Sequence, residues 1–294
     1  MEIRLLRYFL AIAKEQTISQ AAEVLHITQP TLSRQLKEFE ESLGTTLFIR
    51  KDKKMYLTES GQFLKNRAEE ILYLTDETER EFQIKGDILL KGNINIGCVE
   101  ADNSDTLALM LEEFTEEHPQ VSFSIFSGTS DDIVEKLERG LLDIAILLEP
   151  IKITNYHIFP LPRKERWGLL VSNQSYLTQK ESIHLEELIG VPLLISSRND
   201  IQQMIYSWKG IDEEDLNIVG TFNLIFNVFS LVANRVGSAL TIEGAVYNRQ
   251  DTEITFLPLE PEITTNCVLV WKKNHMFSPT VERFIETFQH AFEA

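Results

Sequence analysis

The stretch TISQAAEVLHITQPTLSRQLKEF, residues 17–39, decides the fold of the first part of this chain. Its first half places small and apolar residues at the helical spacing i, i+3, i+4 and i+7, namely Ile18, Ala21, Ala22 and Leu25. After a turn at residues 26–28, Thr28 is suited to cap a second helix and Pro30 to stand in its first turn. The pattern predicts two short helices joined by a tight turn.

The second of these helices has a polar face that suits the major groove of DNA. Its buried side is expected to hold Leu32, Leu36 and Phe39. Its exposed side combines short polar side chains with basic residues: Gln29, Pro30, Thr31, Ser33, Arg34 and Lys37. Short side chains let the backbone approach the bases, and an arginine one turn into the helix reaches guanine or phosphate. The alternative is an ordinary helical hairpin with a solvated face, and periodicity alone does not separate the two.

The residues that follow favour the DNA-binding interpretation. Leu43-Gly44 end the helix, and residues 46–50 and 55–58 have the composition of two short strands. The basic turn Lys51-Asp52-Lys53-Lys54 between them would form a wing beside the DNA backbone. We therefore expect a winged helix-turn-helix with further DNA contacts outside the second helix, from Thr17, Ser19, Arg50 and Lys51.

Residues 9–61 resemble the N-terminal domain of LysR-type transcriptional regulators, at the spacings of that family. The matching residues are Phe9-Leu10-Ala11, Ala21-Ala22, Leu25, QPTLSRQ at 29–35, Leu43-Gly44, Leu47-Phe48, Arg50 and LTESG at 57–61. The resemblance implies an α/β protein with an N-terminal winged helix-turn-helix and a long linker helix. It also implies a C-terminal effector domain of two Rossmann-like lobes, similar to periplasmic solute-binding proteins.

This organisation divides the chain into three parts. Residues 1–58 would form the DNA-binding domain, and residues 59–90 the dimerisation helix and a hinge. Residues 91–294 would form the effector domain, with lobe I at 91–161 and 267–294 and lobe II at 162–266. In this third part strands and helices alternate, which favours α/β lobes with mostly parallel sheets. The resemblance continues there through Ile96-Gly97, Phe114, His118-Pro119, Gly128-Thr129, Gly140, Leu142-Asp143, Leu231-Val232 and Gly237.

The linker carries an apolar stripe that its own domain is too small to cover. Its members are Phe63, Leu64, Ala68, Ile71, Leu72, Leu74 and Phe82. We expect this stripe to pack against its copy in a homodimer, and the alternative is a solvated linker. The resemblance implies a tetramer built from such dimers. Gly86-Asp87 and Lys91-Gly92 mark the hinge that follows.

The net charge of −17 is unevenly distributed along the chain. The first 60 residues hold nine Lys/Arg and eight Asp/Glu, a net charge of about +1, so all of the excess negative charge lies beyond them. An acidic remainder repels nucleic acid and confines contact to the N-terminal domain. No apolar run approaches a membrane span, and two cysteines give no disulfide framework. A cytoplasmic protein without a membrane partner is expected.

The resemblance places a small-molecule effector, of an identity that the sequence does not give, at the carboxyl ends of the strands of both lobes. The corresponding residues are Glu100, Ala101, Asp102, Asn103, Ser104, Thr129, Leu148, Ser196, Ser197, Arg198, Phe222, Asn223 and Ile242. Two features depart from the family. Residues 100–105 are EADNSD where many relatives use Ser or Thr to bind a carboxylate, and Arg235 stands where glycine is frequent.

The acidic loop suggests a neutral, zwitterionic or singly charged effector. Glu100, Asp102 and Asp105 would repel a multiply charged anion, unless the loop is only a solvated rim. Arg198 is the obvious cation for a carboxylate, and Thr129 and Ser196 would supply hydrogen bonds.

Catalysis finds little support in this sequence. It lacks a G-x-S-x-G elbow, a P-loop and a G-x-G-x-x-G motif, and its six histidines are scattered. We expect no enzyme activity, no cofactor and no metal site. Two alternatives stay open: a redox-sensing regulator acting through Cys98, and a solute-binding or enzymatic α/β protein with an incidental helical hairpin. The segments QPTLSRQL and LTESG argue against the second. Double-stranded DNA is the expected partner, with RNA polymerase as a further one.

Overall fold

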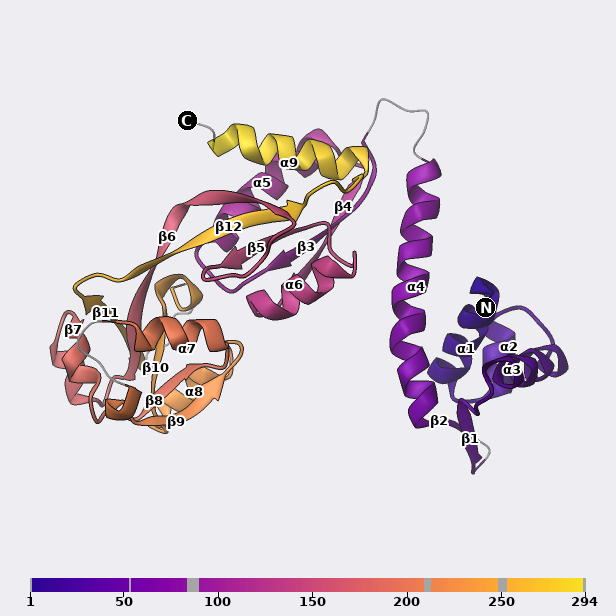
Figure 1. The fold of residues 1–294 in the computed structure, drawn as a ribbon, viewed down its shortest axis with the longest axis horizontal. Helices are drawn as coiled ribbons and strands as arrows, with labels where there is room; N and C mark the ends of the chain where they lie inside the picture. Colours follow the sequence, from indigo (N-terminus) through magenta and orange to yellow (C-terminus); the bar gives the residue numbers. More distant parts are fainter. Residues whose placement is uncertain (1, 53, 84–89, 209–212, 248–252, 293–294) are drawn as a thin grey trace. The chain divides into compact units, whose positions relative to one another are not determined.

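The computed structural model describes residues 2–52, 54–83, 90–208, 213–247 and 253–292. The chain forms two compact units, residues 1–86 and 87–294 (Figure 1). Two features expected from the sequence, Lys53 of the wing and the Gly86-Asp87 hinge, lie outside the described residues, as does the side chain of Phe82. Among the helices that are described, none combines the length and the apolar character that crossing a membrane requires.

The first unit is a winged helix-turn-helix, as the sequence predicted. Its elements are α1 (Ile3–Glu15), α2 (Ile18–Val24), α3 (Gln29–Leu43), β1 (Phe48–Lys51), β2 (Lys54–Leu57) and α4 (Glu59–Gln83). The Thr28 hydroxyl accepts a hydrogen bond from the Thr31 N–H at 3.4 Å and caps α3, and Pro30 stands in its first turn. Gly44 ends α3 in the left-handed conformation, with φ of 66°.

The core of this unit lies beneath the two crossing helices. It joins apolar side chains of all four helices and the wing: Leu6, Phe9, Ile12, Ala21, Ala22, Leu32, Leu36, Phe39, Leu47, Phe48, Leu64 and Ala68. The Thr58 hydroxyl caps α4 by accepting from the Gly61 N–H at 2.9 Å. A side chain at Gly61 would place its Cβ only 2.2 Å from the Leu47 carbonyl oxygen. The LTESG segment therefore holds α4 tightly against the base of the wing.

The long helix α4 corrects one expectation about the apolar stripe. Leu64 and Ala68 are buried in the core of the first unit, and Ile71 and Leu72 pack against the same core. The reason is that the first half of α4 lies along α1. Phe63 and Leu74 differ, because their side chains are 67% and 41% exposed. They lie eleven residues apart, which is about three helical turns, so they share one face.

Lobe I of the second unit is a small parallel α/β layer. It contains β3 (Gly92–Cys98), α5 (Asn103–Glu117), β4 (Val121–Ser127), α6 (Ser130–Glu138) and β5 (Ile144–Leu148), closed by α9 (Pro279–Phe292). β3 pairs in parallel with both β4 and β5. In Figure 1, α5 and α9 lie on one side of these strands and α6 on the other. This coverage explains why β5 is almost wholly apolar and buried.

Lobe II repeats the arrangement with a different set of strands. It contains β7 (Ile183–His184), β8 (Leu193–Ser196), α7 (Asn199–Tyr206), β9 (Ile218–Phe222), α8 (Val228–Ala233), β10 (Ser238–Ile242) and β11 (Ile254–Glu260). β8 pairs in parallel with β9 and with β10. The carboxyl ends of the lobe II strands therefore meet at one edge, as they do in lobe I.

Two long strands join the lobes. β6 (Tyr156–Ser172) pairs antiparallel with β12 (Thr264–Lys272) in its first half and with β10 and β11 in its second half. β12 also pairs antiparallel with β5. Parallel pairing thus occurs inside the lobes, and the strands that cross between them are antiparallel.

Some local elements differ from what the sequence pattern predicts, which is a helix over residues 224–234 and a strand over residues 167–172 after a crossover framed by Pro160 and Pro162. The helix begins only at Val228, because residues 223–227 form a turn at the lobe interface. The strand begins at Tyr156, so Pro160 and Pro162 lie inside it. The pattern predicts neither β7 nor β11. Pro258 lies in β11, which pairs with β6 and places Pro258 opposite Gly168.

Candidate functional site

The exposed face of α3 presents the polar side chains that the sequence pattern predicted. Ser33, Arg34 and Lys37 are exposed, and Leu32 and Phe39 are buried beneath them. The Arg34 side chain is 70% exposed, and its Nε lies 3.8 Å from the Glu38 carboxylate, a loose ion pair within the helix. Nothing in these contacts fixes Arg34 against the domain.

The other expected DNA contacts flank this face within the first unit. Gln29 and Pro30 are exposed at the start of α3, whereas the Thr31 hydroxyl lies 2.8 Å from that of Thr28. Thr17 caps α2 by accepting from the Gln20 N–H at 3.3 Å. Ser19 on α2, and Arg50 and Lys51 on β1, are exposed at separate points of the unit.

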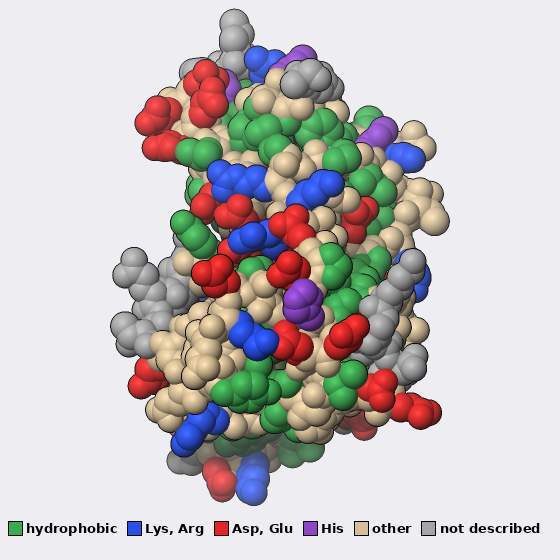
Figure 2. All heavy atoms as spheres, turned by 90° about the vertical axis from the view of Figure 1, so that its left-hand side faces the viewer, with side chains coloured by type: hydrophobic (Ala, Val, Ile, Leu, Met, Phe, Trp, Pro, Cys, Tyr) green, Lys and Arg blue, Asp and Glu red, His purple; other side chains and the backbone are tan. Residues whose placement is uncertain are grey.

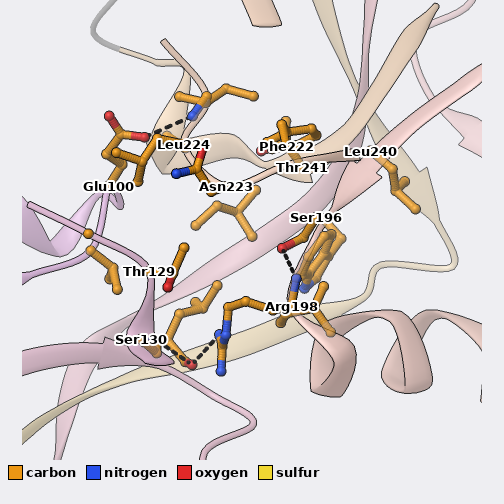
Figure 3. A pocket seen from close by; sticks show the side chains of 18 residues that line it. Glu100, Thr129, Ser130, Ser196, Arg198, Phe222, Asn223, Leu224, Leu240 and Thr241 are labelled. Atoms are coloured by element: carbon orange, nitrogen blue, oxygen red, sulfur yellow. Dashed lines mark hydrogen bonds between the residues drawn. The ribbon is translucent and has the colours of Figure 1, made fainter. Parts of the chain in front are cut away.

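A cavity of about 80 Å³ lies between the two lobes of the second unit. Eight of the expected effector residues line it: Glu100, Thr129, Leu148, Ser196, Arg198, Phe222, Asn223 and Ile242 (Figure 3). They come from the carboxyl ends of strands in both lobes, as expected of an open α/β sheet. The remainder of the wall is largely apolar.

Arg198 bridges the lobes instead of standing free in the cavity. It follows β8 in lobe II, and its side chain is 6% exposed. Its Nη2 donates to the Pro150 carbonyl oxygen at 2.7 Å, and its Nη1 donates to the Leu148 carbonyl oxygen at 3.2 Å. Its Nε donates to the Asp131 carboxylate at 3.2 Å. All three acceptors belong to lobe I, so the structure does not present Arg198 as the free cation that the sequence suggested.

Glu100 makes a second contact across the lobes. Its Oε2 accepts a hydrogen bond from the Ile225 N–H at 2.9 Å, in the turn that precedes α8 (Figure 3). Lys152 of lobe I and Asp200 of lobe II form a third contact, an ion pair whose lysine side chain is 80% exposed. The acidic loop is therefore not a continuous wall: Glu100 faces the cavity, Asp102 pairs with Arg163 at 3.1 Å, and Asp105 is exposed.

The two expected hydroxyl donors differ in their availability. The Thr129 hydroxyl donates to Asp132 Oδ2 at 2.7 Å and accepts from the Asp132 N–H, a capping box that begins α6. Ser196 Oγ accepts from the Arg198 N–H at 3.2 Å. Because an accepting hydroxyl keeps its own proton, Ser196 retains a donor for a ligand, whereas Thr129 uses its donor locally.

The remaining expected residues lie outside the cavity wall. Ala101 and Asn103 are buried at the start of α5, where Asn103 Nδ2 donates to the Arg163 carbonyl oxygen at 3.1 Å. Asp102 pairs with Arg163. Ser104 is exposed on the outer side of lobe I, and the Ser197 N–H donates to the Phe222 carbonyl oxygen at 2.7 Å. None of these five residues lines the cavity between the lobes.

Several residues of the cavity wall were not expected from the sequence. They are Val99, Gly128, Ser130, Trp167, Ile201, Leu224, Ile225, Leu240, Thr241 and Ala245. Five of the ten directly neighbour an expected residue, as Ser130 neighbours Thr129, so extending each expected strand end by one residue would have found those five. Trp167 had no such signal. The long strand β6 brings it beneath the cavity, and its Nε1 donates to the Thr265 hydroxyl at 2.7 Å.

A buried carboxyl group lies where the crossing strands meet lobe I. Glu165 is 1% exposed, and its Oε1 accepts a hydrogen bond from Asn103 Nδ2 at 3.2 Å. Its Oε2 makes no hydrogen bond with the described residues. Burial raises the pKa of Glu165, and the hydrogen bond from Asn103 only partly opposes that shift.

Both cysteines are buried, at Cys98 in β3 and Cys267 in β12. Burial raises the pKa of the Cys98 thiol to about 11, and burial also raises the pKa of Cys267. A thiol that stays protonated at neutral pH is a poor nucleophile toward oxidants. These environments argue against redox sensing. Among the described residues, no cluster of three His, Cys, Asp or Glu side chains is arranged to hold a metal ion.

A winged helix-turn-helix followed by a two-lobed α/β domain with an inter-lobe cavity defines a DNA-binding protein of the ligand-responsive class. Two family models match the chain: "Bacterial regulatory helix-turn-helix protein, lysR family" over residues 3–62 and "LysR substrate binding domain" over residues 89–293. The chain belongs to the LysR family of transcription regulators. It is a DNA-binding regulator with an effector-binding domain, not an enzyme.

Similar proteins extend over nearly the whole chain. HTH-type transcriptional regulator BsdA of Bacillus subtilis (strain 168) is 29% identical and covers 98% of this chain and 100% of its own length. Hca operon transcriptional activator HcaR of Escherichia coli (strain K12) is 26% identical and covers 98% of this chain and 97% of its own length. Full-length CbnR, in its crystal structure with the target DNA, is 21% identical in sequence and has a TM-score of 0.76. The match covers 99% of this chain and 100% of the CbnR chain. At that identity the likeness to CbnR establishes the fold.

Proposed function

We propose that α3 reads the operator, with Arg34 as the main base-contacting side chain. Arg34 is exposed on the face that also holds Ser33 and Lys37, and its loose ion pair with Glu38 costs little to displace. Gln29, Pro30 and Thr31 begin the same helix. Thr17 and Ser19 on α2, and Arg50 and Lys51 on the wing, would contact sugar and phosphate, which positions the protein without reading the sequence.

The three parts of the chain have different tasks. Residues 1–58 bind DNA, residues 59–90 pair two copies, and residues 91–294 bind the effector. Pairing through α4 is supported by Phe63 and Leu74, which share a face and are exposed. Ile71 and Leu72 are not suited to this contact, because they pack within their own unit. A dimer of this kind presents two copies of α3 to half-sites about one helical turn, or roughly 34–36 Å, apart.

The effector would bind between the lobes and act on their separation. The cavity of about 80 Å³ is far smaller than the roughly 300–1,000 Å³ of ordinary ligand pockets. A metabolite therefore fits only when the lobes move apart, which breaks contacts of Arg198 and Glu100. The effector shifts the balance between two lobe separations by its differential affinity for them.

The wall of this cavity favours a small effector with little charge. Arg198 already donates to lobe I, Glu100 holds a backbone N–H, and most other wall residues are apolar. Ser196, unlike Thr129, keeps its hydroxyl proton to donate to a ligand. The proposal keeps the neutral, zwitterionic or singly charged class expected from the sequence, but replaces the carboxylate contact of Arg198 with a lobe-bridging one. A tetramer stays a prediction from the family resemblance, and RNA polymerase contact and a cytoplasmic location stay predictions from the sequence.

The observation that carries the proposal is the exposed polar face of α3, together with the exposed Phe63 and Leu74 side chains on one face of α4. Selection of bound fragments from a genomic DNA library should enrich a sequence with two related half-sites about 10 base pairs apart. The double variant Phe63→Glu with Leu74→Glu should sediment as a monomer and lose that enrichment. Gln62→Glu, at an exposed neighbouring position on α4, adds one negative charge without removing an apolar side chain and should change neither.

An unchanged oligomer in the double variant would refute pairing through this face of α4. Enrichment of fragments without any shared sequence would refute specific readout by α3.

A further inference from the structure

A second cavity, of about 370 Å³, lies in lobe II, away from the inter-lobe cavity. β8 and β10 run parallel, and their carboxyl ends at Ser196 and Ile242 border the inter-lobe cavity. Their amino ends, at Pro192 and Ser238, line the second cavity. The two cavities therefore lie at opposite ends of the same strands, and the described residues that line one do not line the other.

The polar side chains of this second cavity are hydrogen-bond donors. Ser172 Oγ accepts from the Gln174 N–H at 3.4 Å, and Ser175 Oγ accepts from the Leu177 N–H at 3.3 Å. Each hydroxyl has thus used an acceptor site and keeps its proton to donate. The Ser238 hydroxyl lines the cavity as well. A ligand that meets these groups is best supplied with acceptors.

Arg235 adds a positive charge to these donors. Within the part of the chain that the structure describes, its guanidinium forms neither an ion pair nor a hydrogen bond. On the face drawn in Figure 2, lysine and arginine side chains lie among carboxylates. The described lining of this cavity contains no carboxylate, although the chain has 45 Asp and Glu against 28 Lys and Arg. The local charge is opposite to that of the protein.

The backbone at Arg235 is also better suited to another residue. α8 ends with the Val236 N–H donating to the Leu231 carbonyl oxygen at 2.9 Å, and Arg235 takes a left-handed φ of 61°. This is the helix-ending position where glycine is favoured, because a side chain there is strained. Glycine at this position would therefore remove the positive charge without straining the turn.

The floor of the cavity is apolar. Leu177, Val191 and Val232 are buried beneath it, and Tyr176 and Ile189 are exposed at its edge. A volume of about 370 Å³ falls at the lower end of ordinary small-molecule pockets, roughly 300–1,000 Å³. The Arg235 guanidinium and the serine hydroxyls can bind a ligand group with one negative charge. The apolar floor can then pack against a short hydrocarbon part of the same ligand.

The geometry points to a second ligand site in lobe II, in which Arg235 and the hydroxyls of Ser172, Ser175 and Ser238 bind a small amphipathic monocarboxylate. The carboxylate lies at Arg235, and an aromatic or branched aliphatic body lies over Leu177 and Val232. This site goes beyond the inter-lobe effector site, and its existence does not depend on which ligand that site takes.

The test is isothermal titration calorimetry of the full chain at fixed ionic strength, with phenylacetate and 4-methylpentanoate as probes. Wild type should bind both, and should bind the neutral analogue phenylacetamide at least about tenfold more weakly, because the charge-assisted contact is lost. Arg235→Gly should weaken phenylacetate binding by at least about tenfold without lowering the melting temperature, since glycine suits the left-handed backbone. Arg235→Lys, which keeps the charge, should retain part of the affinity.

The control for location is Thr241→Val, a nearly isosteric change in the wall of the inter-lobe cavity. It should leave phenylacetate binding unchanged. Binding that survives Arg235→Gly but is lost in Thr241→Val would assign the probe to the inter-lobe cavity and overturn the proposal. Inorganic phosphate binding as tightly as the carboxylates would overturn the amphipathic class, and no heat with any carboxylate at millimolar concentration would overturn the site itself.

Discussion

Replacement of Arg198 by alanine tests whether this side chain holds the lobes together. The hydrogen bonds to the Leu148 and Pro150 carbonyl oxygens, at 3.2 and 2.7 Å, come from a charged donor and contribute about 1.5–3 kcal/mol each. The Asp131 ion pair adds little, because that carboxylate is 64% exposed. Removing the buried guanidinium also removes its desolvation cost. We expect Arg198→Ala to lower the free energy of unfolding of the effector domain by about 2–4 kcal/mol in total.

Differential scanning calorimetry of the full chain measures this loss. For a domain of this size, each kcal/mol lowers the melting temperature by about 2–4 °C, so Arg198→Ala should lower that of the effector domain by roughly 4–16 °C. The matched control is Lys152→Ala. It also removes a contact across the lobes, with Asp200, but the lysine is 80% exposed and should contribute no more than about 1 kcal/mol. Equal shifts in the two variants, or an unshifted Arg198→Ala, would refute the assignment of Arg198 as the bridge.

Two further predictions concern the buried carboxyl group and the wing. Because burial raises the pKa of Glu165 in the folded state, the folded protein holds more protons than the unfolded chain between the ordinary and the raised pKa. The free energy of unfolding should therefore fall as the pH rises through that window. Glu165→Gln should be more stable than wild type at neutral pH but not below the ordinary pKa. If free energies of unfolding measured in urea change with pH in the same way in both proteins, this prediction is contradicted. The double variant Arg50→Ala with Lys51→Ala should reduce the slope of log affinity against log salt by about 2, without changing sequence preference. An altered preference in a fluorescence-anisotropy series would assign the wing a role in base readout.

The winged helix-turn-helix was predictable because its signals are local. Thr28 caps α3, Pro30 occupies its first turn and Gly44 ends it, each within a few residues of the feature that it determines. The alternating strands and helices of the effector domain were predictable for the same reason. β11 was not, because Pro258 breaks the pattern of a strand, and its pairing with β6 depends on residues about 90 positions away.

The candidate effector site shows where the sequence signal ends. The family positions found strand ends correctly, so Glu100, Ser196 and Phe222 line the cavity. Counting charges along the chain could not show that Arg198 reaches the backbone carbonyls of the other lobe. It also could not show that Thr129 uses its hydroxyl in a capping box. These contacts depend on the closure of two lobes, which no local pattern encodes.

Operator affinity of Arg34→Ala, measured by fluorescence anisotropy at fixed salt on the selected DNA, tests most directly whether α3 reads the sequence. In the free protein Arg34 contributes only its exposed ion pair with Glu38, about 0.3–0.5 kcal/mol, so a larger loss must come from DNA. We expect Arg34→Ala to lose about 1–3 kcal/mol of specific binding free energy and to relax the preference at one base pair. Lys37→Ala, the comparison on the same face, should weaken specific and nonspecific DNA alike. Unchanged specific affinity and unchanged preference in Arg34→Ala would contradict the account.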